Sequence, residues 1–363
     1  MTVYTWLVVL LLLAALLMQG NVKGNKKFII VAFVLLFCVM GLRDVYTIGN
    51  DSSSSYLHHF QGMENAAWDE LGGKGEENYN MGFSYLMKVG YELTDGDYQL
   101  FIALLTVFVL FSYVRFIKKY SSSPIQSVLY FLGLMFYTFL FDALKQSIAM
   151  AILLFAFDAI IDRRIGKFII LVLLAAWFHF PALIFLPAYW IGNMKLGRGY
   201  LFLLAAMLVV TYFFRDQMID MMTDAYSTEL YDNGLRFLAN KVVVMLIIVV
   251  AALVLRPPTQ NDRVYCTLLQ LIGVAVVLQT FASYNNTFTR LADYYFQVSI
   301  VFLPLVFEKC ELKKCYFNPK TDRMIKTVAP IAFCGFAIWR FLGNVNADEF
   351  LSPYVFFFQS TLQ

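Results

Sequence analysis

Four cations stand out because each abuts one end of an apolar run long enough to form a helix: Arg43, Lys145, Arg290 and Arg340. A cation beside hydrocarbon is costly and generally needs an anion close by. Arginine binds phosphate oxygens through two N–H groups at once and stays charged in a partly dry site. If these cations gather in the fold, their chemistry favours binding of a phosphate-bearing ligand.

Each of these cations also has a structural interpretation. Arg43 has two carboxylates nearby with which it could pair, at Asp44 and Asp51, and Arg290 has Asp293 near helical spacing. The lysine could simply extend its stem from a helix end into water. Five further cations lie in or beside acidic stretches, where we expect them to be solvated or ion-paired: Lys74, Lys88, Arg215, Arg236 and Lys241.

Asp51 and His179 are the candidates for proton transfer, because a carboxylate or an imidazole can take a proton from a hydroxyl. His179 is the single histidine within an apolar segment, and polar groups in such segments of membrane proteins tend to face a cavity. A purely structural histidine and a turn-forming aspartate are the alternatives. The adjacent His58 and His59 are interpreted as solvated loop residues.

The chain around these residues is strongly apolar. With 363 residues, 60% of them hydrophobic, it carries more apolar surface than one soluble core could bury. Its apolar runs repeatedly approach bilayer-spanning length. The composition predicts an all-α polytopic membrane protein surrounded by a lipid bilayer, with no nucleic-acid partner. We expect no cofactor and no metal site, since Cys310 and Cys315 have C-x4-C spacing without a histidine nearby.

We expect one transmembrane domain over residues 1–363, with about 11–12 spanning helices. Lys23, Lys26 and Lys27 follow the first apolar run and mark the cytoplasmic side, which places the N-terminus outside. The expected spans lie near residues 2–19, 28–42, 98–117, 124–141, 144–161, 200–214, 238–255, 264–282, 291–307 and 327–342.

The stretch between Lys167 and Lys195 is too short for two full spans of about 20 residues each. Basic residues at both of its ends nevertheless require an even number of crossings. The sequence therefore predicts a pair of shortened or broken helices that meet near Phe178 to Pro181. A single crossing is the alternative, and it would invert the sidedness of everything that follows.

Two extracytoplasmic loops are expected, at about 43–97 and about 215–236. Within the first, MGFSYLMKVGYEL alternates apolar and polar residues at near-helical spacing. This pattern predicts an amphipathic helix that lies on the membrane surface.

Four short motifs occur in order along the chain. The first combines G-x-R at Arg43 and G-x-D at Asp51 with Tyr56, and the others are KQSIAMAI (145–152), WFHFPAL (177–183) and TRLADYYF (289–296). Together they resemble the pattern of the EpsG/Wzy-type bacterial polysaccharide polymerases. Lys145 and Gln146 stand where that family generally has Arg-Gln, so the charge is kept and the two-pronged binding of arginine is lost.

The resemblance implies a GT-C-like helical glycosyltransferase of the bacterial cytoplasmic membrane that makes O-antigen, capsule or exopolysaccharide. Its substrate would be an oligosaccharide linked to undecaprenyl diphosphate, and a flippase and a chain-length regulator of the same pathway would be its partners. Asp51 or His179 would be the base. The residues that contact substrate would be Arg43, Lys145, Gln146, Arg290, Tyr294, Arg340 and Tyr56.

Two other functions fit a polytopic chain with cationic helix ends. A lipid-glycan flippase or transporter would have many spans, but polar residues near the membrane midplane are typical of that class. Here the polar residues cluster at the predicted outer rim, which favours an enzyme. An O-antigen ligase or a membrane acyltransferase would share the arginine and histidine chemistry.

Overall fold

The structure, a computed structural model, describes residues 2–18, 22–49, 53–71, 81–226, 236–255, 262–282, 287–308 and 319–360. It is 82% helical, and no strand occurs within those ranges. An isolated antiparallel bridge joins Arg43 to Phe356. The prediction of an all-α polytopic membrane protein is confirmed.

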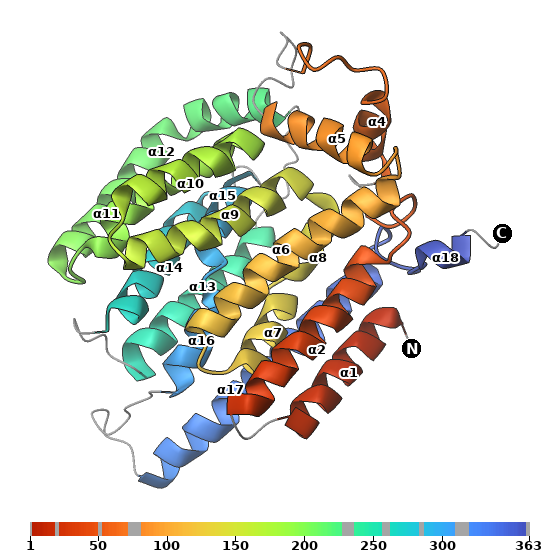
Figure 1. Ribbon diagram of the computed structural model, residues 1–363. Helices are drawn as coiled ribbons and strands as arrows, with labels where there is room; N and C mark the ends of the chain where they lie inside the picture. Colours follow the sequence, from red (N-terminus) through yellow and green to blue (C-terminus); the bar gives the residue numbers. More distant parts are fainter. Residues whose placement is uncertain are drawn as a thin grey trace. The chain divides into compact units, whose positions relative to one another are not determined.

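Helices form where the sequence has long apolar runs (Figure 1). Those up to residue 161 are α1 (Val3–Met18), α2 (Val22–Gly41), α4 (Ser55–Gly62), α5 (Met81–Leu93), α6 (Tyr98–Tyr120), α7 (Pro124–Gly133), α8 (Phe136–Asp142) and α9 (Leu144–Ile161). Those after it are α10 (Ile165–Phe178), the 3-10 helix η2 (Phe180–Phe185), α11 (Ala188–Asn193), α12 (Arg198–Tyr226), α13 (Arg236–Leu255), α14 (Arg263–Thr280), α15 (Thr287–Phe296), α16 (Ser299–Glu308), α17 (Pro319–Ala347) and α18 (Phe357–Ser360).

Five stretches in the described ranges are long and apolar enough to cross a membrane, namely Gly24–Gly41, Tyr98–Tyr120, Leu144–Ile161, Arg263–Thr280 and Lys326–Ala347. The pair formed by α15 and α16, bent by 48°, makes six if it counts as one span. This number is below the expected 11–12 because the remaining apolar segments form shorter or interrupted helices. One interruption is Met135, a left-handed residue with a φ of 69° between α7 and α8.

The helix break predicted near Phe178 to Pro181 is present. Helix α10 ends at Phe178, and η2 begins at Phe180. His179 is the residue between them, and 5% of it is exposed. Pro181, two residues after this histidine, disfavours the α-helical conformation of Phe180, which explains the position of the break.

The chain forms two compact units. The first contains Met1–Ala151, Trp177–His179 and Ala329–Gln363, and the second contains Ile152–Ala176 and Phe180–Val328. Helices α9, α10 and α17 therefore contribute residues to both units. The expectation of a single transmembrane domain stays a prediction.

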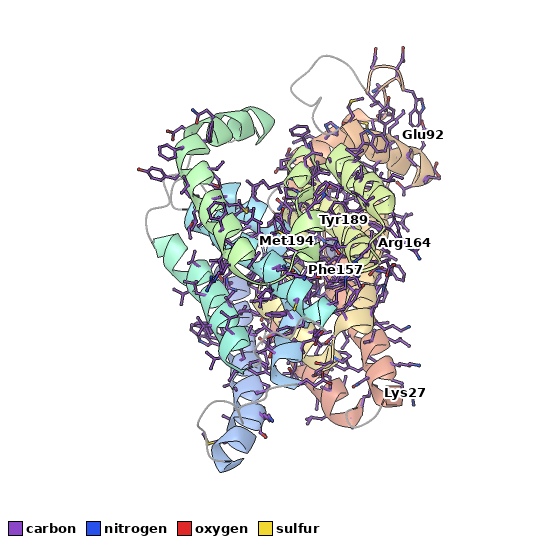
Figure 2. All side chains as sticks on the ribbon, turned by 90° about the vertical axis from the view of Figure 1, so that its left-hand side faces the viewer. Lys27, Glu92, Phe157, Arg164, Tyr189 and Met194 are labelled. Atoms are coloured by element: carbon purple, nitrogen blue, oxygen red, sulfur yellow. The ribbon has the colours of Figure 1, made fainter. Side chains whose placement is uncertain are left out.

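In the first unit α2 packs against α1, α6 and α7, and α5 packs against α4 and α6. The predicted amphipathic helix is confirmed as α5, which buries Phe83, Ser84 and Met87 on one side and exposes Leu93. Figure 2 shows Lys27 and Glu92 at opposite ends of this unit. Helix α5 thus lies far from the lysines that the sequence assigns to the cytoplasm.

In the second unit α14 is the central helix, and it contacts α11, α12, α13, α15 and α16. Helix α12 continues to Tyr226, so residues 215–226 are helical where the sequence predicted the start of a loop. No proline or glycine interrupts the chain there, and a helix therefore continues past the apolar run. Residues 227–235 of the predicted loop lie outside the described residues.

Candidate functional site

The loop directly after α2, residues 42–49, carries Arg43 and Gly49 of the first sequence motif and is held by hydrogen bonds. Gln99 of α6 accepts from the Val45 N–H at 3.2 Å and donates to the Gly41 carbonyl at 3.1 Å. Gly49 has a φ of +99°, a conformation that residues with a side chain rarely adopt. The motif's second glycine is therefore required by the backbone.

The same loop is covered by residues 350–357, which we call the C-terminal strap. Burial raises the pKa of the Tyr354 hydroxyl in this strap. Hydrogen bonds join the strap to α2 and to the loop: Tyr354 Oη to Val39 O at 2.5 Å, Phe357 N to Leu42 O at 3.1 Å, Asp44 N to Val355 O at 2.9 Å, and Gly49 N to Phe350 O at 3.0 Å.

Arg43 lies between α2, this loop and α8, and none of its surface is exposed. Its guanidinium donates to the carbonyls of Met40 at 2.6 Å, Ile48 at 3.4 Å and Phe141 at 3.5 Å, and it lies 4.6 Å from the Phe141 ring centre. Burial lowers the pKa of Arg43. A guanidinium enclosed in this way positions the backbone, so direct contact with a diphosphate is not favoured by this geometry.

Arg340 also reaches a helix end. Its Nη1 donates to the carbonyl of Gly133 at 2.8 Å, and Gly133 is the last residue of α7. A cation at a helix C-terminus is stabilised by the partial negative charge of the last carbonyls. Arg340 thus serves as a cap for α7.

Lys145 has different surroundings. It lies in the first turn of α9, is partly exposed, and has its Nζ 5.8 Å from the ring centre of Tyr56 and 5.4 Å from that of Phe83. The two rings pack edge to face at 5.3 Å. Gln146 is buried beside it and donates to the Sδ of Met150 at 3.9 Å. Lys145 is thus a partly exposed cation that lies against two aromatic rings.

Helix α5 links this lysine to the segment that ends at His179. Phe83 contacts Lys145, and the preceding Gly82 approaches Trp177 so closely that an added Cβ would lie 2.7 Å from the Trp177 carbonyl oxygen. Tyr85 packs on the same tryptophan, with ring centres 6.0 Å apart. A glycine is needed at position 82 for this contact, and it brings α5 against the C-terminal end of α10.

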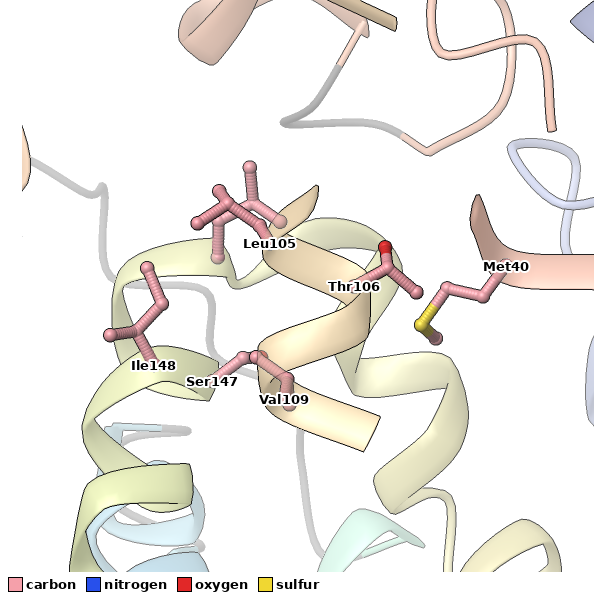
Figure 3. Close-up of a pocket in the computed structure, with 7 residues that line it drawn as sticks. Met40, Leu105, Thr106, Val109, Ser147 and Ile148 are labelled. Carbon is pink, nitrogen blue, oxygen red and sulfur yellow. The ribbon is translucent and has the colours of Figure 1, made fainter. Parts of the chain in front are cut away.

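A small cavity lies between α2, α6 and α9 (Figure 3). Its volume of about 10 Å³ corresponds to about one water molecule. Its lining is largely apolar, formed by Met40, Leu105, Thr106, Val109, Leu144, Ser147 and Ile148. The cavity is too small for a sugar or a diphosphate.

In the second unit the buried Asp293 of α15 pairs with Lys241 of α13 at 2.5 Å. The prediction that Lys241 is solvated or ion-paired is thus confirmed, and the ion pair joins α13 to α15. Arg290 is partly exposed, whereas Tyr294 is completely buried. Sequence reasoning could not find the lysine partner because 52 residues separate it from the aspartate.

Two further sequence expectations concern the candidate base Asp51 and a metal site. Asp51 lies outside the described residues. Among the residues that are described, no three His, Cys, Asp or Glu side chains form a group able to hold a metal ion.

A helical chain with several helices that are long and apolar enough to cross a membrane is a multi-pass membrane protein. The model of the EpsG family matches residues 26–356, and the chain belongs to this family. Membership indicates a polysaccharide polymerase-type function of the glycosyltransferase kind. No curated protein and no solved structure matches the chain.

Proposed function

We propose that the protein joins lipid-linked oligosaccharide repeat units at the outer face of the bacterial cytoplasmic membrane. It would transfer a growing glycan from undecaprenyl diphosphate to the non-reducing end of another lipid-linked unit. A GT-C-like architecture, and a flippase and a chain-length regulator as pathway partners, belong to the same proposal. Lys145, a partly exposed cation beside two aromatic rings in a chain of this family, is the observation that supports it best.

In the proposed reaction an acceptor hydroxyl oxygen attacks the anomeric carbon of the donor sugar. The bond from that carbon to the diphosphate oxygen breaks, and its electron pair leaves with undecaprenyl diphosphate. Lys145 stabilises the negative charge that develops on the leaving group without a metal ion. Tyr56 offers a ring face to the sugar.

The proton of the acceptor hydroxyl passes to a base. The sequence offers Asp51 and His179 for this role. Arg43 and Arg340, which donate to backbone carbonyls, act by holding α2, α7 and the loop after α2 in place.

The test is elongation of a defined lipid-linked repeat unit by the protein reconstituted in liposomes. Lys145→Gln should lower the rate by about 100-fold or more, because a cation that stabilises developing charge is lost. Lys145→Arg, which keeps the charge, should retain activity, and Lys27→Gln at the opposite end of the first unit should behave as the unmodified protein. Normal chain length in Lys145→Gln would remove this residue from the mechanism.

The same system separates the rival functions. In cells without the protein, unpolymerised units should accumulate on the outer face of the membrane, whereas loss of a flippase would leave them on the inner face. A ligase or an acyltransferase would give a product other than a lengthened lipid-linked chain.

A further inference from the structure

His59, interpreted from the sequence as a solvated loop residue, has a defined polar partner. Its Nε2 lies 3.4 Å from the Oγ of Ser84, and this contact joins α4 to α5. Ser84 is 7% exposed, while His59 is partly exposed. A buried hydroxyl that contacts one ring nitrogen fixes the orientation of an imidazole that a substrate can still reach.

His59 also lies near residues that the proposed function assigns to the substrate. It follows Tyr56 by three positions on α4, a spacing that puts two side chains on one helix face about 5–6 Å apart at their Cβ atoms. Its partner Ser84 directly follows Phe83 on α5, and Lys145 lies over both the Tyr56 and the Phe83 ring. A cation, an oriented imidazole and two aromatic rings therefore share one neighbourhood.

A general base must come within hydrogen-bond reach of the proton that it removes. His179 is 5% exposed, so a sugar hydroxyl cannot approach its ring in this structure, and Asp51 lies outside the described residues. His59 is partly exposed and lies one helical turn from Tyr56, whose ring contacts the lysine that would hold the leaving group.

We infer that His59 is the base that takes the proton from the acceptor hydroxyl and that Ser84 is the positioning residue for its ring. This inference rests on the proposed polymerase function and names a group for a step of that reaction. The hydroxyl oxygen forms its bond to the anomeric carbon while the proton moves to a ring nitrogen of His59. The proton then leaves to solvent, and the diphosphate leaves with the electron pair of the broken bond.

The experiment compares His59→Ala and His59→Asn with the matched control His58→Ala, an exposed histidine on the same helix. In liposomes that contain the defined lipid-linked unit, both His59 variants should lose about 100-fold or more in kcat with KM changed less than about 2-fold, as expected for a lost base. Added imidazole should restore part of the activity to His59→Ala, whereas His58→Ala should keep full activity and show no response.

Ser84 is tested in the same assay. Ser84→Ala should lower kcat about 10-fold at unchanged KM, and Ser84→Thr, which keeps a hydroxyl, should restore it. A thermal melt of each variant separates a folding defect from a chemical one. If His59→Ala melts early, His59→Asn, which keeps a polar side chain, decides.

The outcomes are distinct. A folded His59→Asn that elongates normally overturns the role of His59 and leaves the polymerase proposal intact. Lost activity in His59→Ala that imidazole does not restore, in a protein with an unchanged melting temperature, also overturns proton transfer. Failure of the unmodified protein to elongate any lipid-linked unit overturns the polymerase proposal itself, and this inference with it.

Discussion

Arg43 and Lys145 carry the same charge at the ends of apolar helices, and their surroundings differ in kind. Arg43 is enclosed and donates to three carbonyls, so its charge is used within the protein. Lys145 lies against the faces of two rings, an arrangement that attracts a cation without neutralising it. The first residue holds the loop after α2, and the second lies partly exposed beside two aromatic rings.

Replacement of Arg43 should therefore affect stability first. Arg43→Met leaves the carbonyls of Met40, Ile48 and Phe141 without this donor, and each buried group left unsatisfied costs about 1–3 kcal/mol. We expect a loss of about 2–5 kcal/mol in the free energy of unfolding, measured by denaturation in detergent. Arg164→Met, at an exposed arginine, is the control. An unchanged stability together with weakened substrate binding would instead place Arg43 at the diphosphate.

At the scale of elements, the C-terminal strap and α5 each supply groups that contact residues from distant segments of the chain. The strap supplies acceptors to the N–H groups of Asp44 and Gly49, and it donates to the carbonyls of Val39 and Leu42. Helix α5 supplies the aromatic ring beside Lys145 and the hydroxyl beside His59. Both elements thus hold segments that lie far from them in the sequence.

Tyr354→Phe tests the strap. Loss of the hydroxyl removes the hydrogen bond to the Val39 carbonyl, which should lower the free energy of unfolding by about 1 kcal/mol. Amide hydrogen exchange at Asp44 and Gly49 should become faster, because both N–H groups donate to the strap. Tyr46→Phe, an exposed tyrosine of the same loop, is the matched control. Equal exchange rates in the two variants would show that the strap does not hold the loop.

The helices, the break at His179 and the amphipathic α5 could be predicted because apolar runs, prolines and periodicity are local signals. The break at Met135 could not, since its left-handed backbone has no signature in that residue type. In the site, Lys145 was predicted from its place at a helix end. The partners of Arg43 are backbone carbonyls, which every residue has, and the His59–Ser84 contact joins residues that lie 25 positions apart.

At the scale of the whole molecule, sidedness follows from the distribution of basic residues. Lys27 belongs to the lysines assigned to the cytoplasm, and Glu92 of α5 lies at the other end of the first unit (Figure 2). Arg164 follows α9 in another basic cluster that the sequence assigns inside.

Single cysteines placed at these positions in a cysteine-free background should confirm that assignment. In intact cells an impermeant thiol reagent should label Glu92→Cys and leave Lys27→Cys and Arg164→Cys unlabelled until the membrane is opened. Labelling of Lys27→Cys in intact cells would reverse the orientation and place the Lys145 region in the cytoplasm, which is incompatible with polymerisation at the outer face.

The strap has a consequence for biosynthesis. Residues 42–49 leave the ribosome early, but the partners of the Asp44 and Gly49 N–H groups and of the Leu42 carbonyl come from positions 350–357, more than 300 residues later. A nascent chain can thus insert nearly all of its helices while this loop still lacks its final partners. Competence for chemistry should appear abruptly, after the last stretch has been translated and has folded back onto the first.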